Sequence, residues 1–210
     1  MRRFSAVLTM LLCLLCACSS GKGTDDVQAA MDFRADLLSA GGCAFQSECT
    51  ADWGDTVFSC TLDGALDPEG GGRVTVLAPE SVAGISATLN GGEGTLEYQD
   101  VALGLSPLPG SIAPIQLPGV FVQAWAQGWI AGAGRDTDAL CVQYELGYGP
   151  EKLTIYTWFD ENAHPLRGEL YYDDHMGAAV TLTDFTLAPG GTNETVETDL
   201  GQRVPGQSEP

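Results

Sequence analysis

The residues best suited to covalent chemistry in this chain are its seven cysteines. Two of them, Cys49 and Cys60, lie on either side of a Gly54-Asp55 pair, within stretches where polar and apolar residues alternate. A glycine-first pair is typical of a two-residue hairpin turn, and that turn fixes a register in which Cys49 faces Cys60. The sequence therefore predicts either a disulfide across the hairpin or two thiols buried as small apolar side chains.

Two further cysteines, Cys43 and Cys141, complete an even set of four beyond residue 40. Cys141 alternates with Gln143 and Glu145, so it lies on the more polar face of its predicted strand, which disfavours a pairing with Cys43. This set contains no C-x2-C or C-x-x-H pair of the kind that zinc sites use. We therefore expect no metal.

The two histidines are the natural candidates for acid–base chemistry. His164 lies in a turn that ends at Pro165, and His175 follows Asp173 and Asp174, which makes an Asp-Asp-His cluster. Consecutive strand residues point to opposite faces, so this cluster is more typical of a solvated hairpin tip than of a metal site. The sequence has no nucleophile elbow, zinc-protease motif, phosphate-binding loop or dinucleotide fingerprint. We expect no cofactor and no enzymatic activity.

The amino-terminal residues have the pattern of an export signal. Arg2 and Arg3 precede an apolar stretch at 4–15, which is too short for a comfortable membrane span. The stretch ends in Leu15-Cys16-Ala17-Cys18, which resembles the lipobox of bacterial lipoproteins. This pattern predicts a signal peptide at 1–17 and an extracytoplasmic chain held to a membrane by lipid on Cys18. The alternative is ordinary secretion with cleavage near Ser19.

The composition limits the classes of partner. The chain has 28 acidic and 9 basic residues, a formal net charge of −19, which repels nucleic acid and anionic lipid headgroups. Its hydrophobic content of 44% is too high for wholesale disorder, and its 27 glycines and 11 prolines indicate many turns. These numbers favour one mainly β domain over a helical bundle.

Two helices and a series of strands are expected to position these residues. Apolar stripes at helical spacing predict a helix from Thr24 to the glycines at 41–42 and another from Pro118 to the glycines at 132–134. Turn residues separate predicted strands at 43–53, 56–63, 73–77, 84–89, 95–98, 101–105, 139–146, 152–160, 167–173 and 178–187. Residues 18–24 are interpreted as a tether and residues 188–210 as a flexible tail, which leaves one domain at 25–187.

The order of these elements resembles the lipoprotein-carrier (LolA-like) superfamily and LolA-like lipoproteins of Gram-positive anaerobes. The matching stretches are 79–86 (PESVAGIS), 158–160 (WFD) with Pro165, and 180–185 (VTLTDF). The resemblance covers roughly residues 27–187. It implies an α+β fold, mainly β with two helices: a strongly curved antiparallel sheet that forms an unclosed half-barrel covered by helix. In carriers of this superfamily the concave face accepts acyl chains, whereas related germination lipoproteins bind proteins.

A half-barrel of this kind encloses space that a ligand or the core can fill. Its predicted lining consists of large apolar side chains from the sheet and the second helix: Phe45, Phe58, Leu62, Phe121, Trp125 and Trp129. The alternative is that these side chains simply form the core. We expect a membrane-anchored protein that binds a lipid or other hydrophobic ligand; the alternative is a module that docks an envelope protein and has no small-molecule ligand. A tether at Cys18 disfavours a soluble shuttle.

Overall fold

The computed structural model describes residues 22–188, apart from residues 53, 55, 91, 92, 100 and 106–111. The predicted signal peptide, Cys18 and the predicted tail beyond residue 188 lie outside the described residues. The elements run in the order α2 (Lys22–Ala40), β1 (Cys43–Asp52), β2 (Val57–Leu66), β3 (Gly72–Ala78), β4 (Ser86–Asn90), β5 (Glu93–Tyr98), β6 (Val101–Leu105), η1 (Pro114–Gln116), α3 (Leu117–Gln127), β7 (Trp129–Asp136), β8 (Ala139–Leu146), η2 (Gly149–Glu151), β9 (Leu153–Phe159), β10 (Pro165–Tyr172) and β11 (His175–Leu187).

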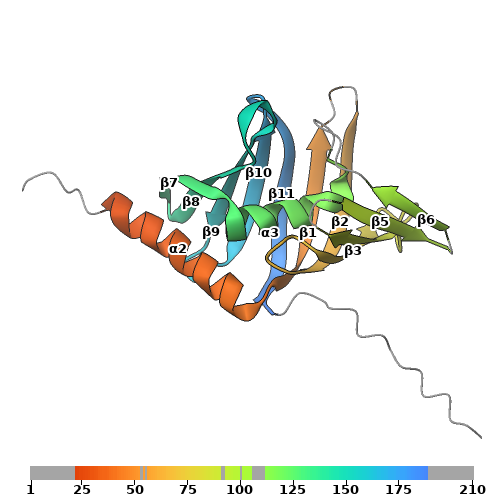
Figure 1. Ribbon diagram of the computed structural model, residues 1–210, viewed down its shortest axis with the longest axis horizontal. Helices are drawn as coiled ribbons and strands as arrows, with labels where there is room; N and C mark the ends of the chain where they lie inside the picture. Colours follow the sequence, from red (N-terminus) through yellow and green to blue (C-terminus); the bar gives the residue numbers. More distant parts are fainter. Residues whose placement is uncertain are drawn as a thin grey trace, which may run out of the picture.

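All of these strands belong to one antiparallel sheet with eleven strands. Two meanders, β1–β6 and β7–β11, meet where β1 pairs with β11, and this leaves β6 and β7 as the two edges. The sheet is therefore not closed into a barrel. It curves around the helices, and α3 crosses its concave face (Figure 1). The predicted fold class, a mainly β half-barrel covered by helix, is confirmed.

The β1–β2 hairpin has the register that its turn predicted. Cys49 pairs with Cys60, Ala51 with Phe58 and Ser47 with Leu62. Alternate residues of β1 are buried from Cys43 to Ala51, as expected for a strand with one face against a core. The sequence pattern thus predicted the register of the hairpin and the inward face of β1.

The second helix differs from its prediction at its carboxyl end. It ends at Gln127, where the N–H of Gly128 donates to the carbonyl of Ala124 at 2.9 Å and the backbone of Gly128 is already extended. Residues 129–136 then form the edge strand β7, which pairs with β8. The prediction of helix up to residue 132 was wrong because β7 is rich in small residues and lacks the β-branched alternation that marks most strands.

A glycine on β10 lets α3 lie close to the sheet. A Cβ at Gly168 would come within 2.2 Å of Cε1 of Phe121, so the aromatic ring occupies the space that a side chain would need. One turn further along α3, Nε1 of Trp125 donates to Oγ1 of Thr157 on β9 at 2.9 Å. Ring packing and a satisfied indole donor therefore fix the helix on β9 and β10.

The amino-terminal helix α2 stabilises the carboxyl end of α3. Arg34 donates through Nε to the carbonyl of Trp125 at 2.8 Å and through Nη2 to the carbonyl of Gly128 at 2.5 Å. A cation at this position also interacts favourably with the helix dipole. From the same helix, Phe33 packs edge-on against Trp125 and Phe159. The core therefore lies between the two helices and the concave face.

Candidate functional site

A cavity of about 550 Å³ lies between α3 and the ends of several strands of the concave face. Its wall on α3 includes Leu117 and Val120, and its opposite wall includes Leu153, Leu170 and Ala178. Further apolar lining comes from Leu89, Ile112 and Leu146. Such a surface holds an apolar group by removing it from water and offers little to a strongly hydrated one.

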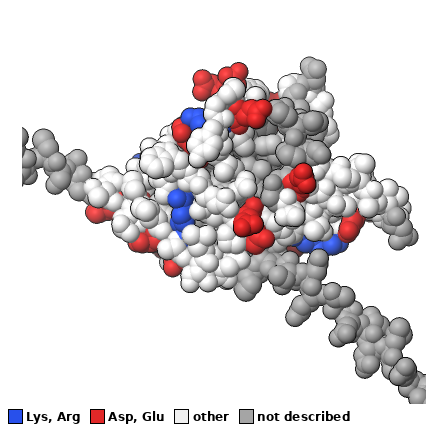
Figure 2. All heavy atoms as spheres, in the orientation of Figure 1, with Lys and Arg blue, Asp and Glu red and all other residues white. Residues whose placement is uncertain are grey.

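Charged side chains surround the mouth of this cavity. We define the acidic rim as four carboxylates that line the cavity and are exposed or half-buried: Asp52, Glu69, Glu151 and Asp173. They come from the end of β1, the turn before β3, η2 and the β10–β11 turn. Carboxylates also outnumber basic side chains on the face of the molecule that carries α3 (Figure 2). The cavity thus combines an apolar interior with a negative entrance.

None of the six side chains predicted to line a cavity contributes to this one. Four of them, Phe45, Leu62, Phe121 and Trp125, are buried in the core, which corresponds to the alternative interpretation from the sequence. Phe58, the second residue of β2, is 41% exposed. Trp129 is 72% exposed because it begins the edge strand β7 and does not continue the inner face of α3.

Sequence reasoning missed the residues that do line the cavity because they are scattered over α3, two short helical turns and six strands. The leucines among them are single residues, most of them near strand ends, and they carry no local pattern. The Asp173–His175 stretch was identified only as a hairpin tip, and this prediction is confirmed: Asp173 and Asp174 form the β10–β11 turn with positive φ angles and are exposed. The curvature of the sheet places the Asp173–His175 stretch beside the apolar cavity.

The cysteines of the described region are all free thiols. A hydrogen bond between Cys49 and Cys60 raises the pKa of Cys49, and burial raises it further. The same hydrogen bond lowers the pKa of Cys60, against the opposite effect of burial. This arrangement corresponds to the buried-thiol alternative, and a disulfide between the two strands stays a prediction.

No group of three or more His, Cys, Asp or Glu side chains that could hold a metal ion occurs among residues 22–188 where they are described. His164, in the β9–β10 turn, lies 3.8 Å from Asp160 and is exposed. His175 lies apart from it at the mouth of the cavity. His164 lies in the β9–β10 turn and His175 at the start of β11, so the two histidines form no common site.

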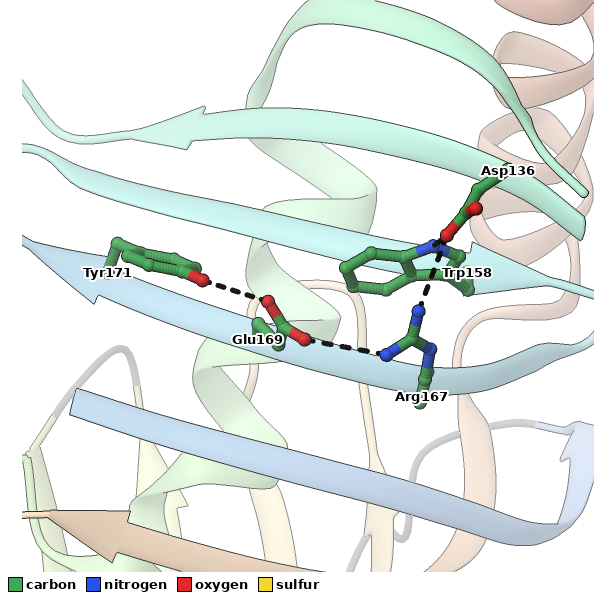
Figure 3. Close-up of polar contacts among 5 residues, drawn as sticks. All are labelled: Asp136, Trp158, Arg167, Glu169 and Tyr171. Carbon is green, nitrogen blue, oxygen red and sulfur yellow. Dashed lines mark hydrogen bonds and ion pairs between the residues drawn. The ribbon is translucent and has the colours of Figure 1, made fainter. Parts of the chain in front are cut away.

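On the outer face of the sheet, five polar and aromatic side chains form a second group, which we call the outer-face cluster (Figure 3). Its members are Asp136, Trp158, Arg167, Glu169 and Tyr171. The Arg167 guanidinium lies 3.8 Å from the centroid of the Trp158 ring and 3.5 Å from both Asp136 and Glu169. Trp158 donates to Asp136 at 2.9 Å, and Tyr171 donates to Glu169 at 3.0 Å. The hydrogen-bonding and charged groups of this cluster therefore have partners within it.

No helix in the described part of the chain has the length and apolar character needed to cross a membrane.

No protein-family model matches this sequence, and no curated protein matches it either. Solved structures do match in fold. A putative outer membrane lipoprotein-sorting protein domain from Vibrio parahaemolyticus is 11% identical, with 83% of this chain and 96% of that chain covered and a TM-score of 0.41. Lipoprotein LppX from Mycobacterium tuberculosis is 10% identical, with coverage of 75% and 93% and a TM-score of 0.36.

A LolA superfamily protein from Nitrosomonas europaea is 11% identical, with 75% of this chain and 93% of that chain covered and a TM-score of 0.39. Likeness at this level concerns the fold and does not extend to ligands or partners. The relation to lipoproteins of Gram-positive anaerobes stays a prediction. In fold, this chain is similar to proteins of the LolA superfamily, as its sequence predicted.

Proposed function

We propose that this protein is a membrane-anchored extracytoplasmic lipoprotein that binds a lipid or another hydrophobic ligand in the cavity beside α3. The cavity itself carries the proposal. Its volume of about 550 Å³ falls within the range of small-molecule sites, and seven of its nineteen lining residues are leucine, isoleucine or valine. The proposed role is binding without chemistry on the ligand.

The physical gain from such binding is sufficient for a specific complex. Each buried methylene contributes roughly 0.8 kcal/mol, so a chain of about eight methylenes gains about 6 kcal/mol before the costs of immobilisation. Because α3 is fixed to the sheet by Phe121 and Trp125, the walls need little rearrangement to receive a ligand. A rigid site loses less free energy on binding than a flexible one.

The anchor is the second part of the proposal. Lipid on Cys18 would hold the domain beside a membrane, since α2 begins at Lys22, only a few residues further along. Two or three acyl chains anchor a protein durably, whereas one does so only marginally. Mass spectrometry of the membrane-extracted protein tests this directly: an acylated peptide that begins at Cys18 is expected, and an unmodified one that begins at Ser19 contradicts the anchor.

Binding is tested with N-phenylnaphthylamine, an uncharged dye whose fluorescence rises in apolar sites, on the purified unlipidated full chain. Gly177→Phe should fill the cavity, because a Cβ at this position meets only Cδ2 of Leu170, at 3.8 Å. Gly132→Phe on β7 is the matched control, since a Cβ there has no atom within 4 Å and Gly132 does not line the cavity.

The expected result is a saturable signal in the wild type and in Gly132→Phe that is lost in Gly177→Phe. Circular dichroism should show all three proteins folded. A wild-type protein without a signal, or a folded Gly177→Phe variant that binds as well as the wild type, contradicts the proposal.

A second candidate function, docking of an envelope protein, is supported by the edge strand β6. Val101 is 68% and Leu103 61% exposed on this strand, and Tyr98 of β5 is also exposed. An unpaired edge with apolar side chains suits the addition of a partner strand. A photo-crosslinker at Leu103 should capture one defined envelope protein that the same crosslinker at the exposed Met31 of α2 does not capture. Identical products at both positions contradict this function.

A further inference from the structure

The acidic rim carries negative charge that the rest of the described structure does not neutralise. Apart from His175, every titratable side chain that lines the cavity is an Asp or a Glu or the phenol of Tyr172. Within the described residues, none of the four rim carboxylates forms an ion pair with a Lys, an Arg or a His. Asp52 accepts a hydrogen bond from the backbone N–H of Gly54, which leaves its charge in place.

The described basic side chains are all engaged elsewhere. Arg34 donates to carbonyl groups at the end of α3. The other four form ion pairs away from the cavity: Arg73 with Glu97, Arg135 with Asp26, Lys152 with Glu145, and Arg167 with Asp136 and Glu169. Among the described side chains, no Lys or Arg is therefore left to pair with the rim, and the charge of a bound cation would be favourable there.

We propose that the cavity selects amphiphiles with a cationic headgroup, such as an alkyl amine or a quaternary ammonium, over anionic amphiphiles with the same tail. This inference rests on the proposed function, because it assigns a headgroup class to the ligand of that same cavity. The apolar walls hold the tail, and the headgroup then lies at the mouth among Asp52, Glu69, Glu151 and Asp173. Each exposed carboxylate interacts weakly with a charge several ångströms away, but the four act in the same direction.

Competition among ligands with one tail and different heads tests the inference. Dodecyltrimethylammonium, dodecyl maltoside and laurate, each below its micelle concentration, displace bound N-phenylnaphthylamine from the unlipidated full chain. The expected affinity order at low ionic strength is cation, then neutral head, then anion, with about a tenfold difference between the two charged ligands. High salt should reduce this difference and leave the affinity for the maltoside nearly unchanged.

Two variants of equal net charge separate the rim from the overall charge. Glu69→Gln/Glu151→Gln/Asp173→Asn neutralises three rim positions, and asparagine tolerates the positive φ angle at residue 173. Asp36→Asn/Glu80→Gln/Glu161→Gln neutralises three exposed carboxylates that do not line the cavity. The first variant should bind the charged ligands with affinities within about twofold of each other, and the second should keep the wild-type preference.

The outcomes distinguish the two proposals. Equal affinities for all three heads in the wild type, or a preference for laurate, overturn the headgroup inference and leave ligand binding intact. An equal loss of preference in both variants also overturns it, since the selectivity would then come from the overall charge. A wild-type protein that binds neither the dye nor any of the three ligands overturns the proposed function and the inference together.

Discussion

The two faces of strands β9 and β10 use polar groups in opposite ways. On the outer face, Arg167 lies between Asp136 and Glu169 and over the Trp158 ring, so the charges of the cluster are compensated (Figure 3). On the concave face the same strands present Ile155, Thr157 and Leu170, and charge gathers only at the cavity mouth. The comparison teaches that charges on the outer face of these strands compensate one another, whereas the carboxylates at the cavity mouth have no basic ion-pair partner among the described residues.

The largest loss of stability is expected from a substitution where α3 packs on the concave face. Trp125 is fully buried and donates to Thr157, so Trp125→Ala should lower the free energy of unfolding by about 3–5 kcal/mol. Trp129→Ala, which removes the same side chain from an exposed position, should change it by no more than about 0.5 kcal/mol. Urea unfolding of both variants measures the difference, and similar losses would contradict the different roles of these two tryptophans.

These tryptophans also show how far the sequence could predict the fold. The signal for the β1–β2 hairpin was local, because alternation and a glycine-first turn suffice to fix a register, and the pairing of Cys49 with Cys60 followed from it. The signal that ends α3, in contrast, is not local in the sequence. Trp129 lies at helical spacing from Trp125, and only its pairing with Glu145 of β8 makes it part of a strand. Tertiary pairing overrode a periodic pattern.

The candidate site was harder to predict than the fold, for a related reason. Large aromatic residues attract attention in a sequence, but in this protein Phe121 and Trp125 fix α3 on the sheet. The cavity arises beside them, where smaller side chains such as Val120 and Ala178 leave space. Empty space results from what several distant elements fail to fill, so no single segment encodes it.

The close approach of α3 to β10 gives the next largest effect. Gly168→Ala would place a Cβ within 2.2 Å of Phe121, and the resulting overpacking should cost about 2–3 kcal/mol. Gly134→Ala on the edge strand β7 meets no atom within 4 Å and should be neutral or slightly stabilising. Thermal unfolding of the two variants checks this contrast. A Gly168→Ala protein as stable as the wild type would mean that α3 does not lie this close to the sheet.

Alkaline pH should destabilise the concave face through Cys43. Burial raises the pKa of this thiol from 9.0 to about 12, so the folded protein keeps a proton that the unfolded chain releases. The stabilisation is complete below about pH 9 and is lost as the pH rises towards about 12, at about 1.4 kcal/mol per pH unit. Urea unfolding at a series of pH values across this range measures the free energy of unfolding. It should fall less steeply with pH for Cys43→Ala than for the wild type. Equal slopes would mean that the thiol is solvated in the folded protein.

The smallest predicted effect compares one tyrosine from each face. Tyr144 on β8 is fully buried, and its hydroxyl has no hydrogen-bond partner among the described residues, whereas the Tyr171 hydroxyl on the outer face donates to Glu169. An unsatisfied buried hydroxyl costs free energy, so Tyr144→Phe should raise the free energy of unfolding by about 1 kcal/mol. Tyr171→Phe removes a satisfied hydrogen bond and should lower it slightly. Chemical denaturation measures the two signs: if Tyr144→Phe also lowers the stability, its hydroxyl has a partner, and the concave face holds a polar contact in addition to those described.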